Sequence, residues 1–165
     1  MESLILNKTQ LLQKIKRIAY EIYEQNYKET ELVLAGLEEN GYVFAEKLKQ
    51  ELGAISAINI QLVRIRLDKT ARKQTEVFVD TDLDSLVNKA VIIVDDVLNT
   101  GRALAFSLQP FLGIDTAKLQ TAVIVDRSHQ LFPISADYVG YSLATTIKEH
   151  IEVSFSEERF GVYIH

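Results

Sequence analysis

The sequence predicts an α/β protein with a mostly parallel central sheet and helices on both of its faces. Three observations carry this prediction. Short apolar runs alternate with stretches in which apolar residues recur at helical spacing, a pattern typical of parallel sheets. The 165 residues are 47% hydrophobic and 25% charged, which is a globular composition and excludes disordered and collagen-like classes. No linker rich in proline, glycine or serine interrupts the chain, so we expect one domain over residues 1–165.

Three absences in the sequence limit the classes of function. Cysteine is absent, which excludes disulfides, thiolate zinc sites and cysteine nucleophiles. No apolar run reaches the roughly 18 residues that span a bilayer. The N-terminal sequence MESLILNKTQ has no basic region of the kind that opens a signal peptide. We therefore expect a cytoplasmic protein without a membrane partner.

The N-terminal half is predicted to contain two helices, a buried strand and a hairpin. Thr9 is the candidate N-cap of a helix over 9–26, whose apolar residues recur at helical spacing. A second helix follows Gly41 and is expected to end at Gly53, because glycine is the usual C-cap. The expected strands are the apolar run 31–36 and the alternating stretches 57–66 and 76–80, which would pair as a hairpin around a flexible loop within about 64–80.

The C-terminal half continues the alternation. The most apolar stretch, 90–95, is expected to be a buried strand, and a helix is expected to begin after Gly101 and to run to about Leu112. The remaining expected strands are 118–126, 137–140, 151–155 and 161–164, of which the last two are expected at a sheet edge or over a lid.

The stretch VIIVDDVLNTGRAL, residues 91–104, carries the clearest chemical pattern. Its apolar strand ends in Asp95 and Asp96, and Thr100 and Gly101 then open a helix. Ligands of parallel sheets collect at the carboxyl ends of the strands, and backbone N–H groups at a helix start favour phosphate. Two acids after a strand also occur simply as solvated polar residues. The complete order of strand, acid pair, Thr-Gly and helix is far more specific for a phosphate site.

This stretch resembles the motif with which type I phosphoribosyltransferases bind phosphoribosyl pyrophosphate (PRPP). A second stretch, VDRSHQLFPISADYVG at 125–140, resembles the bifunctional pyrimidine-operon attenuation protein and uracil phosphoribosyltransferase family, as does RIAYEIYEQN in the first helix. The resemblance extends over nearly the whole chain. It implies the type I phosphoribosyltransferase fold, a homodimer or higher oligomer, and transfer of phosphoribose from PRPP to a pyrimidine base such as uracil with release of pyrophosphate.

The resemblance also implies roles for particular residues. Asp95 and Asp96 would be the catalytic carboxylates, and would hold the ribose and, through water in the metal's shell, Mg²⁺. The loop that cradles the 5′-phosphate would be Leu98, Asn99, Thr100, Gly101, Arg102 and Ala103. The base side of the site would be Asp126, Arg127, Ser128 and His129.

The expected pyrophosphate loop departs from the family pattern. This loop is Glu38, Glu39, Asn40 and Gly41, whereas the family usually places basic residues before the glycine. Like charges about 4 Å apart repel by about 4 kcal/mol at an effective dielectric of about 20, which would weaken PRPP use. The alternative is a harmless acidic loop in which backbone N–H groups hold the ligand.

A second departure lies in the phosphate loop, where Asn99 and Ala103 replace the tyrosine and threonine usual in the attenuation family. Losing one hydroxyl partner costs on the order of 1 kcal/mol, which weakens a phosphate site without abolishing it. The basic residues of the expected flexible loop, Lys69, Arg72 and Lys73, could supply the positive charge that the first loop lacks. The alternative for this charged stretch is a solvated hairpin tip.

Two other functions remain open from the sequence. An RNA-binding regulator of pyrimidine-operon expression is implied by the same resemblance, but 18 basic against 23 acidic residues, a net charge of −5, disfavour RNA as a partner. A family member that binds a nucleotide without turning it over is the other alternative.

Overall fold

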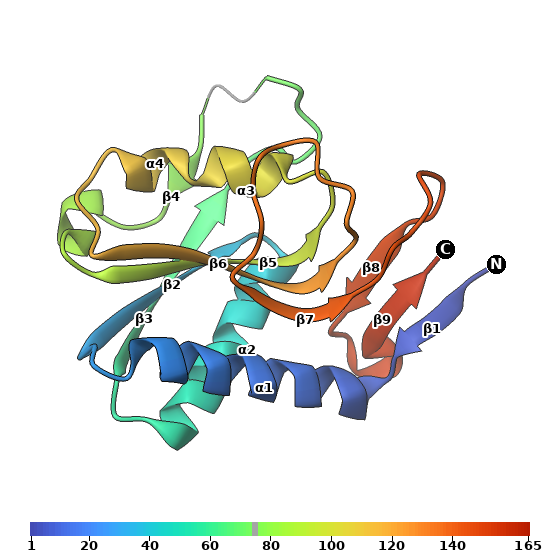
Figure 1. Cartoon of the computed structure of the whole chain (residues 1–165), viewed down its shortest axis with the longest axis horizontal. Helices are drawn as coiled ribbons and strands as arrows, with labels where there is room; N and C mark the ends of the chain where they lie inside the picture. Colours follow the sequence, from blue (N-terminus) through green and yellow to red (C-terminus); the bar gives the residue numbers. More distant parts are fainter. Residues whose placement is uncertain (74–75) are drawn as a thin grey trace.

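The computed structural model describes residues 1–73 and 76–165 (Figure 1). The strands are β1 (Ser3–Leu6), β2 (Glu31–Leu37), β3 (Asn59–Arg66), β4 (Phe78–Val79), β5 (Ala90–Leu98), β6 (Lys118–Asp126), β7 (Tyr138–Ser142), β8 (Ile151–Ser154) and β9 (Gly161–Ile164). The helices are α1 (Lys8–Asn26), α2 (Asn40–Ile55), α3 (Arg102–Ser107) and α4 (Gln109–Leu112), with 3-10 turns at Leu83–Leu86 and Glu157–Arg159.

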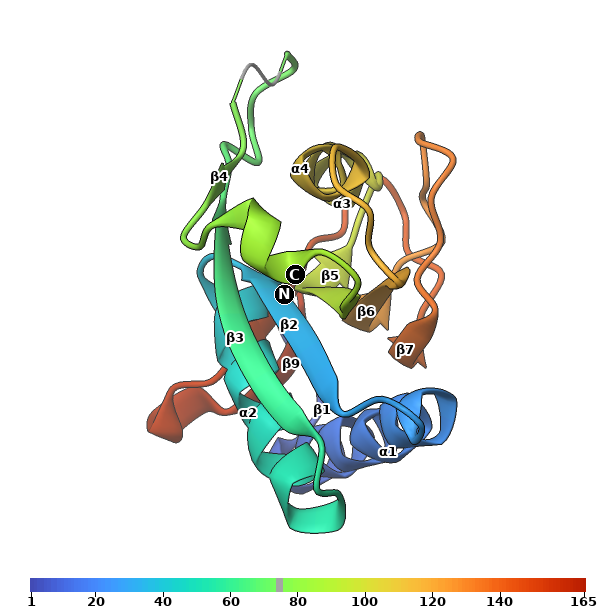
Figure 2. The same cartoon turned by 90° about the vertical axis from the view of Figure 1, so that its left-hand side faces the viewer.

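The central sheet has six strands in the order β4-β3-β2-β5-β6-β7, and all except β4 run parallel. Helices α1 and α2 cover one face, while α3 and α4 cover the other (Figures 1 and 2). Strands β2 and β5 are apolar almost throughout because helices bury both of their sides. The predicted fold class is confirmed.

The predicted hairpin is also confirmed, since β4 pairs antiparallel with the end of β3. Of the expected loop within 64–80, residues 74–75 lie outside the described residues. In the part of the chain that the structure describes, none of the helices combines the length and hydrophobicity that a membrane crossing requires.

The predicted cap of the first helix is wrong. Asn7 rather than Thr9 is the N-cap of α1, and its side-chain oxygen accepts a hydrogen bond from the Gln10 backbone N–H at 2.9 Å. The Gln10 side chain returns the contact to the Asn7 backbone N–H, also at 2.9 Å. This reciprocal pair satisfies two backbone donors that a threonine two residues further along would leave open.

Two further helix boundaries differ from prediction. Gly53 lies inside α2, which continues to Ile55 and is capped by Ser56. The expected continuous helix after Gly101 is divided at Leu108 into α3 and α4. The reason for the division is Pro110, because proline has no N–H to donate to the preceding helical turn.

The last two strands form a separate small sheet with β1, which the sequence pattern did not predict. The order in this sheet is β1-β9-β8, and both pairings are antiparallel. Leu6, Val153 and Val162 pack into the same core as α1 and α2. The small sheet therefore extends one side of the core and does not continue the edge of the central sheet.

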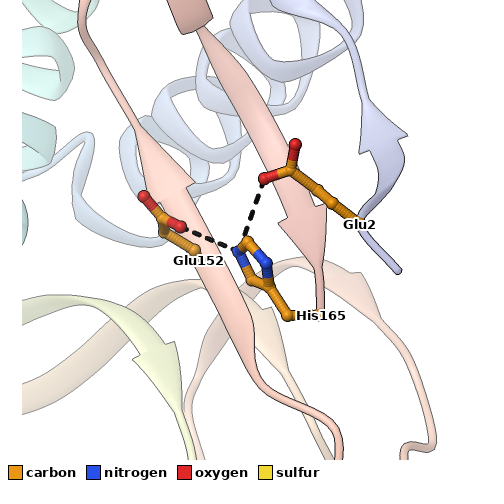
Figure 3. A group of neighbouring side chains, drawn as sticks. All are labelled: Glu2, Glu152 and His165. Carbon is orange, nitrogen blue, oxygen red and sulfur yellow. Dashed lines mark hydrogen bonds and ion pairs between the residues drawn. The ribbon is translucent and has the colours of Figure 1, made fainter.

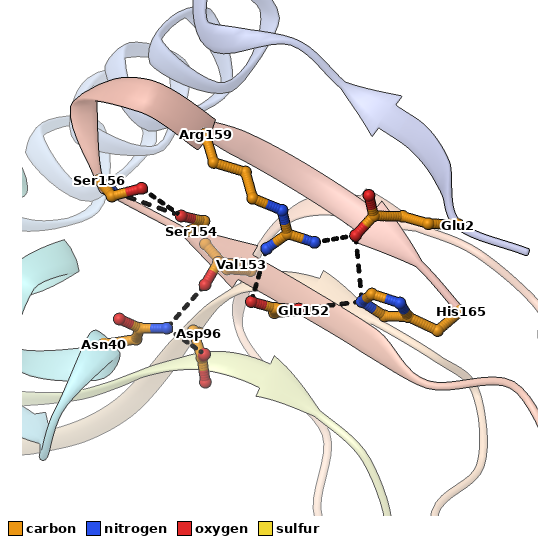
Figure 4. A network of polar contacts seen from close by, with 9 residues as sticks. All are labelled: Glu2, Asn40, Asp96, Glu152, Val153, Ser154, Ser156, Arg159 and His165. Carbon is orange, nitrogen blue, oxygen red and sulfur yellow. Dashed lines mark hydrogen bonds and ion pairs between the residues drawn. The ribbon is translucent and has the colours of Figure 1, made fainter.

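Charged side chains join both ends of the chain across this small sheet. Glu2 and Glu152 both form ion pairs with Arg159, and His165 Nε2 lies 2.9 Å from Glu152 and 3.6 Å from Glu2 (Figures 3 and 4). The backbone of His165 also exchanges hydrogen bonds with His150, so the C-terminal residue is held in place. We call Glu2, Glu152, Arg159 and His165 the terminal cluster.

The parallel pairing brings several loops to one edge of the central sheet. Gly36 of β2 pairs with Val94 of β5, so the loop after β2 reaches the level at which β5 changes from apolar to acidic residues. Leu98 pairs with Asp126, so the loops after β5 and β6 also begin side by side. This convergence makes the carboxyl edge of the sheet the place to look for a site.

The contrast between two glycines in α2 gives a stability prediction. A Cβ on Gly41 would meet the Val94 carbonyl oxygen at 2.6 Å and the Asp95 Cα at 3.0 Å, whereas a Cβ on Gly53 would meet nothing within 4 Å. We expect Gly41→Ala to lower the free energy of unfolding by about 1–3 kcal/mol. Gly53→Ala, the matched control, should raise it by about 0.5–1 kcal/mol because it removes a glycine from a helix interior. Urea unfolding checks both, and equal effects would contradict the close approach of α2 to β5.

Candidate functional site

A cavity of about 270 Å³ opens at the carboxyl end of β5. Its lining combines the acid pair, the following loop and one basic side chain from the segment after β3. The lining residues are Lys69, Asp95, Asp96, Val97, Leu98, Asn99, Thr100, Gly101, Arg102, Ala103 and Leu104. The structure thus brings together the predicted catalytic pair, the whole predicted phosphate loop and Lys69 of the predicted flexible loop.

The two carboxylates share one cation, the Lys69 ammonium. Lys69 Nζ lies 2.7 Å from Asp95 Oδ1 and 3.8 Å from Asp96 Oδ1. The Asp95 side chain is buried, and its Oδ1 also accepts a hydrogen bond from the Asp96 backbone N–H at 2.9 Å. The pair therefore offers oxygen atoms around a position where a cation already sits, which is the donor chemistry that Mg²⁺ prefers.

Burial and mutual repulsion perturb the acid pair. Burial and the neighbouring Asp96 charge raise the pKa of Asp95 to about 7, against the opposing charge of Lys69. Burial lowers the pKa of Lys69, but the Asp95 and Asp96 charges outweigh it and the pKa is raised. A strongly perturbed carboxyl in a cleft marks a functional site more often than a solvated strand end does.

The loop after β5 is held in the shape of a cradle. Gly101 has φ of 88°, in the left-handed region that disfavours other residues, and Thr100 Oγ1 accepts a hydrogen bond from the Arg102 N–H at 3.3 Å. The Arg102 guanidinium turns away from the loop's centre, donating to the Arg72 carbonyl at 2.6 Å and lying over the Phe132 ring. The backbone of this loop is therefore the part available to an anion.

A second cavity, of about 520 Å³, adjoins the first on the β6 side. It is lined by Asn99, Thr100, Arg127, Ser128, His129, Gln130, Leu131 and Ile147. Of the predicted base-binding residues, Arg127, Ser128 and His129 lie here, whereas Asp126 is not among the lining residues and accepts a hydrogen bond from the Ser128 N–H at 2.8 Å. The two cavities share Asn99 and Thr100, so a ligand with a phosphate and a ring could occupy both.

Arg127 is a structural anchor of the second cavity. Its buried guanidinium donates to Asn99 Oδ1 at 2.8 Å, to Thr145 Oγ1 at 2.9 Å and to the Glu149 carbonyl at 2.6 Å. His129 Nε2 contacts the Thr145 carbonyl oxygen. These contacts fix the segment 143–150 beside the phosphate loop, a placement that no local pattern in the sequence indicates.

The acidic loop after β2 is partly neutralised. Glu38 Oε1 lies 3.0 Å from Arg66 Nε and 3.3 Å from Arg64 Nη1. Glu38, Glu39 and Arg64 line a separate cavity of about 340 Å³ beside α2. The two basic residues at the end of β3 therefore supply part of the positive charge that the sequence of the loop lacks.

Asn40 links the acid pair to the small sheet. Its side-chain nitrogen donates to Asp96 Oδ2 at 3.2 Å and to the Val153 carbonyl of β8 at 2.8 Å (Figure 4). Sequence reasoning placed Asn40 in the pyrophosphate loop but gave no signal for this contact, because β8 lies more than a hundred residues away along the chain.

The terminal cluster provides a different set of possible metal ligands. Among the described residues, Glu2, Glu152 and His165 are a group of side chains whose ligand atoms lie within 4.8 Å of one another (Figure 3). Arg159 already neutralises both glutamates. We therefore interpret the cluster as an ion-pair network that joins β1 to β8 and β9.

Comparison with known proteins assigns the family. The family profile described as the phosphoribosyl transferase domain matches residues 3–158. The chain therefore belongs to the phosphoribosyltransferase family. Solved structures of phosphoribosyltransferases share this fold. The hypoxanthine-guanine phosphoribosyltransferase of Bacillus anthracis aligns over 99% of this chain and 98% of its own, with a TM-score of 0.77 at 19% identity. A mutant of the hypoxanthine phosphoribosyltransferase of Trypanosoma cruzi, complexed with the product IMP, gives a TM-score of 0.81 at 20% identity, over 96% of this chain and 81% of its own.

Sequence relatives narrow the group within this family. The chain is 36% identical to the "Bifunctional protein PyrR" of Fusobacterium nucleatum over 161 residues, which cover 93% of this chain and 91% of the relative. It is 35% identical to the "Pyrimidine operon regulatory protein" of Lactococcus lactis over 159 residues, covering 93% of this chain and 90% of that protein. The resemblance inferred from the sequence motifs is confirmed.

The pKa of Asp95 gives a prediction about stability in the absence of metal. An unfolded aspartate titrates near pH 4, so between about pH 4 and 7 the unfolded chain loses this proton before the folded protein does, and stability falls as pH rises. Asp95→Asn removes this loss. We expect the variant to gain about 4 kcal/mol over the unaltered protein at about pH 8 and only about 1 kcal/mol at about pH 4.5, measured by urea unfolding.

The control for this prediction is Asp68→Asn. Hydrogen bonds from the Thr70 hydroxyl and backbone N–H lower the pKa of the Asp68 carboxyl, which is the opposite direction. That variant should gain no stability at alkaline pH. A gain of the same size at both pH values for Asp95→Asn would show that the effect does not come from its titration.

Proposed function

We propose that the protein transfers phosphoribose from PRPP to a pyrimidine base, with uracil the favoured base, and releases pyrophosphate. The observation that carries the proposal is that the buried Asp95 and its neighbour Asp96 line the same cavity as the loop 98–103, the proposed phosphate loop. The choice of a pyrimidine as the base is supported by the Lactococcus lactis relative, which is named as a pyrimidine operon regulatory protein.

The chain's own residues account for the main requirements of this reaction. Displacement of pyrophosphate at the anomeric carbon develops positive charge on the ribose, which the Asp95 and Asp96 carboxylates would stabilise. Backbone groups of the loop 98–103 would hold the 5′-phosphate, so that the anomeric carbon lies toward the second cavity. The base would then enter beside Ser128 and His129, in the cavity they share with the phosphate loop.

Mg²⁺ is the cofactor that we propose for the acid pair. The fit is chemical, since both carboxylates already lie within 4 Å of one cation in the structure. When bound, the ion would neutralise phosphate charge and so favour departure of pyrophosphate. Asp95 and Asp96 would hold it, directly or through its water molecules.

Regulation of a pyrimidine operon through RNA is the second candidate function. The Lactococcus lactis relative is named as a pyrimidine operon regulatory protein, which favours a regulatory role. The net negative charge of this chain disfavours RNA binding. Arg17 of α1, a candidate phosphate contact, is already paired with Glu21 at 2.7 Å and donates to the Gly140 carbonyl at 2.5 Å. RNA binding that weakens steeply with salt would support this role.

Pyrophosphate release tests the transferase proposal. We expect release with PRPP, Mg²⁺ and uracil, less with other pyrimidines and least with hypoxanthine or guanine. The double variant Asp95→Asn/Asp96→Asn should lose at least about a hundredfold in rate, because it removes both stabilising charges. No release with any base, in protein that still binds UMP, would contradict turnover and favour the nucleotide-binding alternative.

The acidic loop predicts a variant that improves substrate use. Glu38 is paired with Arg64 and Arg66, so Glu39 is the carboxylate expected to repel pyrophosphate. We expect Glu39→Lys to lower the KM for PRPP by about tenfold, with kcat little changed. Glu51→Lys makes the same charge change near the other end of α2, outside the cavity that Glu38 and Glu39 line, and is the control. Equal effects of the two variants would indicate a general field effect and not a pyrophosphate subsite.

A further inference from the structure

The Lys69 ammonium lies where a metal ion would have to lie to contact Asp95 and Asp96. The ammonium contacts Asp95 Oδ1 at 2.7 Å and approaches Asp96 Oδ1 at 3.8 Å. The Asp95 side chain is only 3% exposed, so solvent does little to neutralise its charge, whereas the Lys69 side chain is 38% exposed. One partner of this ion pair is fixed in the core of the sheet, and the other reaches it from the surface.

The backbone on both sides of Lys69 is held by hydrogen bonds, one set local and one from a distant segment. The Asp68 carboxylate accepts hydrogen bonds from the Thr70 backbone N–H at 2.9 Å and from the Thr70 hydroxyl at 2.7 Å. Three residues further on, the Arg72 carbonyl accepts from Arg102 Nη1 at 2.6 Å. The segment therefore sits over the cavity because of contacts at Lys69 and Arg102, both of which line the cavity.

We propose that Lys69 is an internal counter-ion of the Asp95–Asp96 pair and that a divalent metal must displace it to reach these carboxylates. This inference rests on the proposed function, since it assigns the metal to this pair. A metal ion and an ammonium cannot both contact Asp95 Oδ1 without strong repulsion between two cations at contact distance. Displacement of the ammonium removes one of the two contacts that hold the segment around Lys69 over the cavity, so metal entry also loosens this segment.

The inference also gives Lys69 a role in the protein without ligand. Without a counter-ion, two adjacent carboxylates, one of them buried, would repel each other with little solvent to screen them. Lys69 supplies that charge in the absence of metal. Once released, its ammonium lies on the segment next to the cavity, where the charge of pyrophosphate is expected.

Metal affinity in the absence of PRPP tests the displacement directly. Binding of Mn²⁺, followed by loss of the free-ion EPR signal, would be compared in the unaltered protein and in Lys69→Gln at about pH 8.5, above the range in which ordinary carboxylates bind protons. We expect Lys69→Gln to bind Mn²⁺ about tenfold more tightly, because the competing cation is gone. Lys73→Gln removes the same charge from the same segment without touching the acid pair, and should leave the affinity within about twofold.

The double variant Asp95→Asn/Asp96→Asn defines Mn²⁺ binding elsewhere on the chain, including the terminal cluster. Unchanged or weaker Mn²⁺ binding in Lys69→Gln would overturn the inference, and so would an equal gain in Lys73→Gln. Absence of any Mn²⁺ binding that depends on the acid pair would overturn it as well. Base-dependent pyrophosphate release would remain as the separate test of the transferase proposal.

Hydrogen exchange gives a second readout that needs no turnover. In the unaltered protein, saturating Mg²⁺ should speed amide exchange at 67–73, since one of the two contacts that hold this segment is lost. In Lys69→Gln the exchange should already be fast without metal and should change little when Mg²⁺ is added. Slower exchange on metal addition in the unaltered protein would contradict displacement of Lys69.

Discussion

The pairing of β5 between β2 and β6 is the constraint on which the site depends. This strand is buried on both faces and hydrogen-bonded on both edges, so it can carry polar side chains only where it leaves the sheet. Asp95 directly follows Val94, the last residue of β5 that pairs with β2, while the pairing with β6 continues to Leu98; Asp95 remains only 2% exposed. Its environment follows from this position: the sheet removes water from the carboxylate, and the loops that emerge at the same edge must supply its partners.

The sequence allowed prediction of the features that depend on local pattern. The central strands, the hairpin of β3 with β4, the acid pair and the Gly101 turn all follow from periodicity or from residue order, and the structure has them. Contacts between distant segments carried no such signal. Lys69 meets Asp95, and Arg127 meets Thr145 and Glu149, through tertiary packing that neither partner's surroundings in the sequence indicate. The small sheet was missed for the same reason, because β1 is short and pairs only with the far end of the chain.

The acidic loop illustrates how register changes the meaning of a local charge. In the sequence of the loop alone, the Glu38 and Glu39 carboxylates are expected to repel an anionic ligand. The pairing of β2 with β3 sets Gly36 beside Arg64, so the arginines that end β3 come within reach of Glu38. The net field at this corner of the site is therefore less negative than the loop sequence indicates, and only one of the two carboxylates keeps an uncompensated charge among the ion pairs of the described residues.

The carboxamide of Asn40 connects two sheets between which the described residues form no strand pairing. One nitrogen atom donates to Asp96 and to the Val153 carbonyl of β8, so local unfolding of the small sheet removes the second acceptor that holds the Asn40 amide beside Asp96. Thermodynamic linkage makes this relation reciprocal. Whatever stabilises Asp96 in its present orientation also resists detachment of β8, so the terminal ion pairs that hold the small sheet together help to orient a carboxylate that none of them touches.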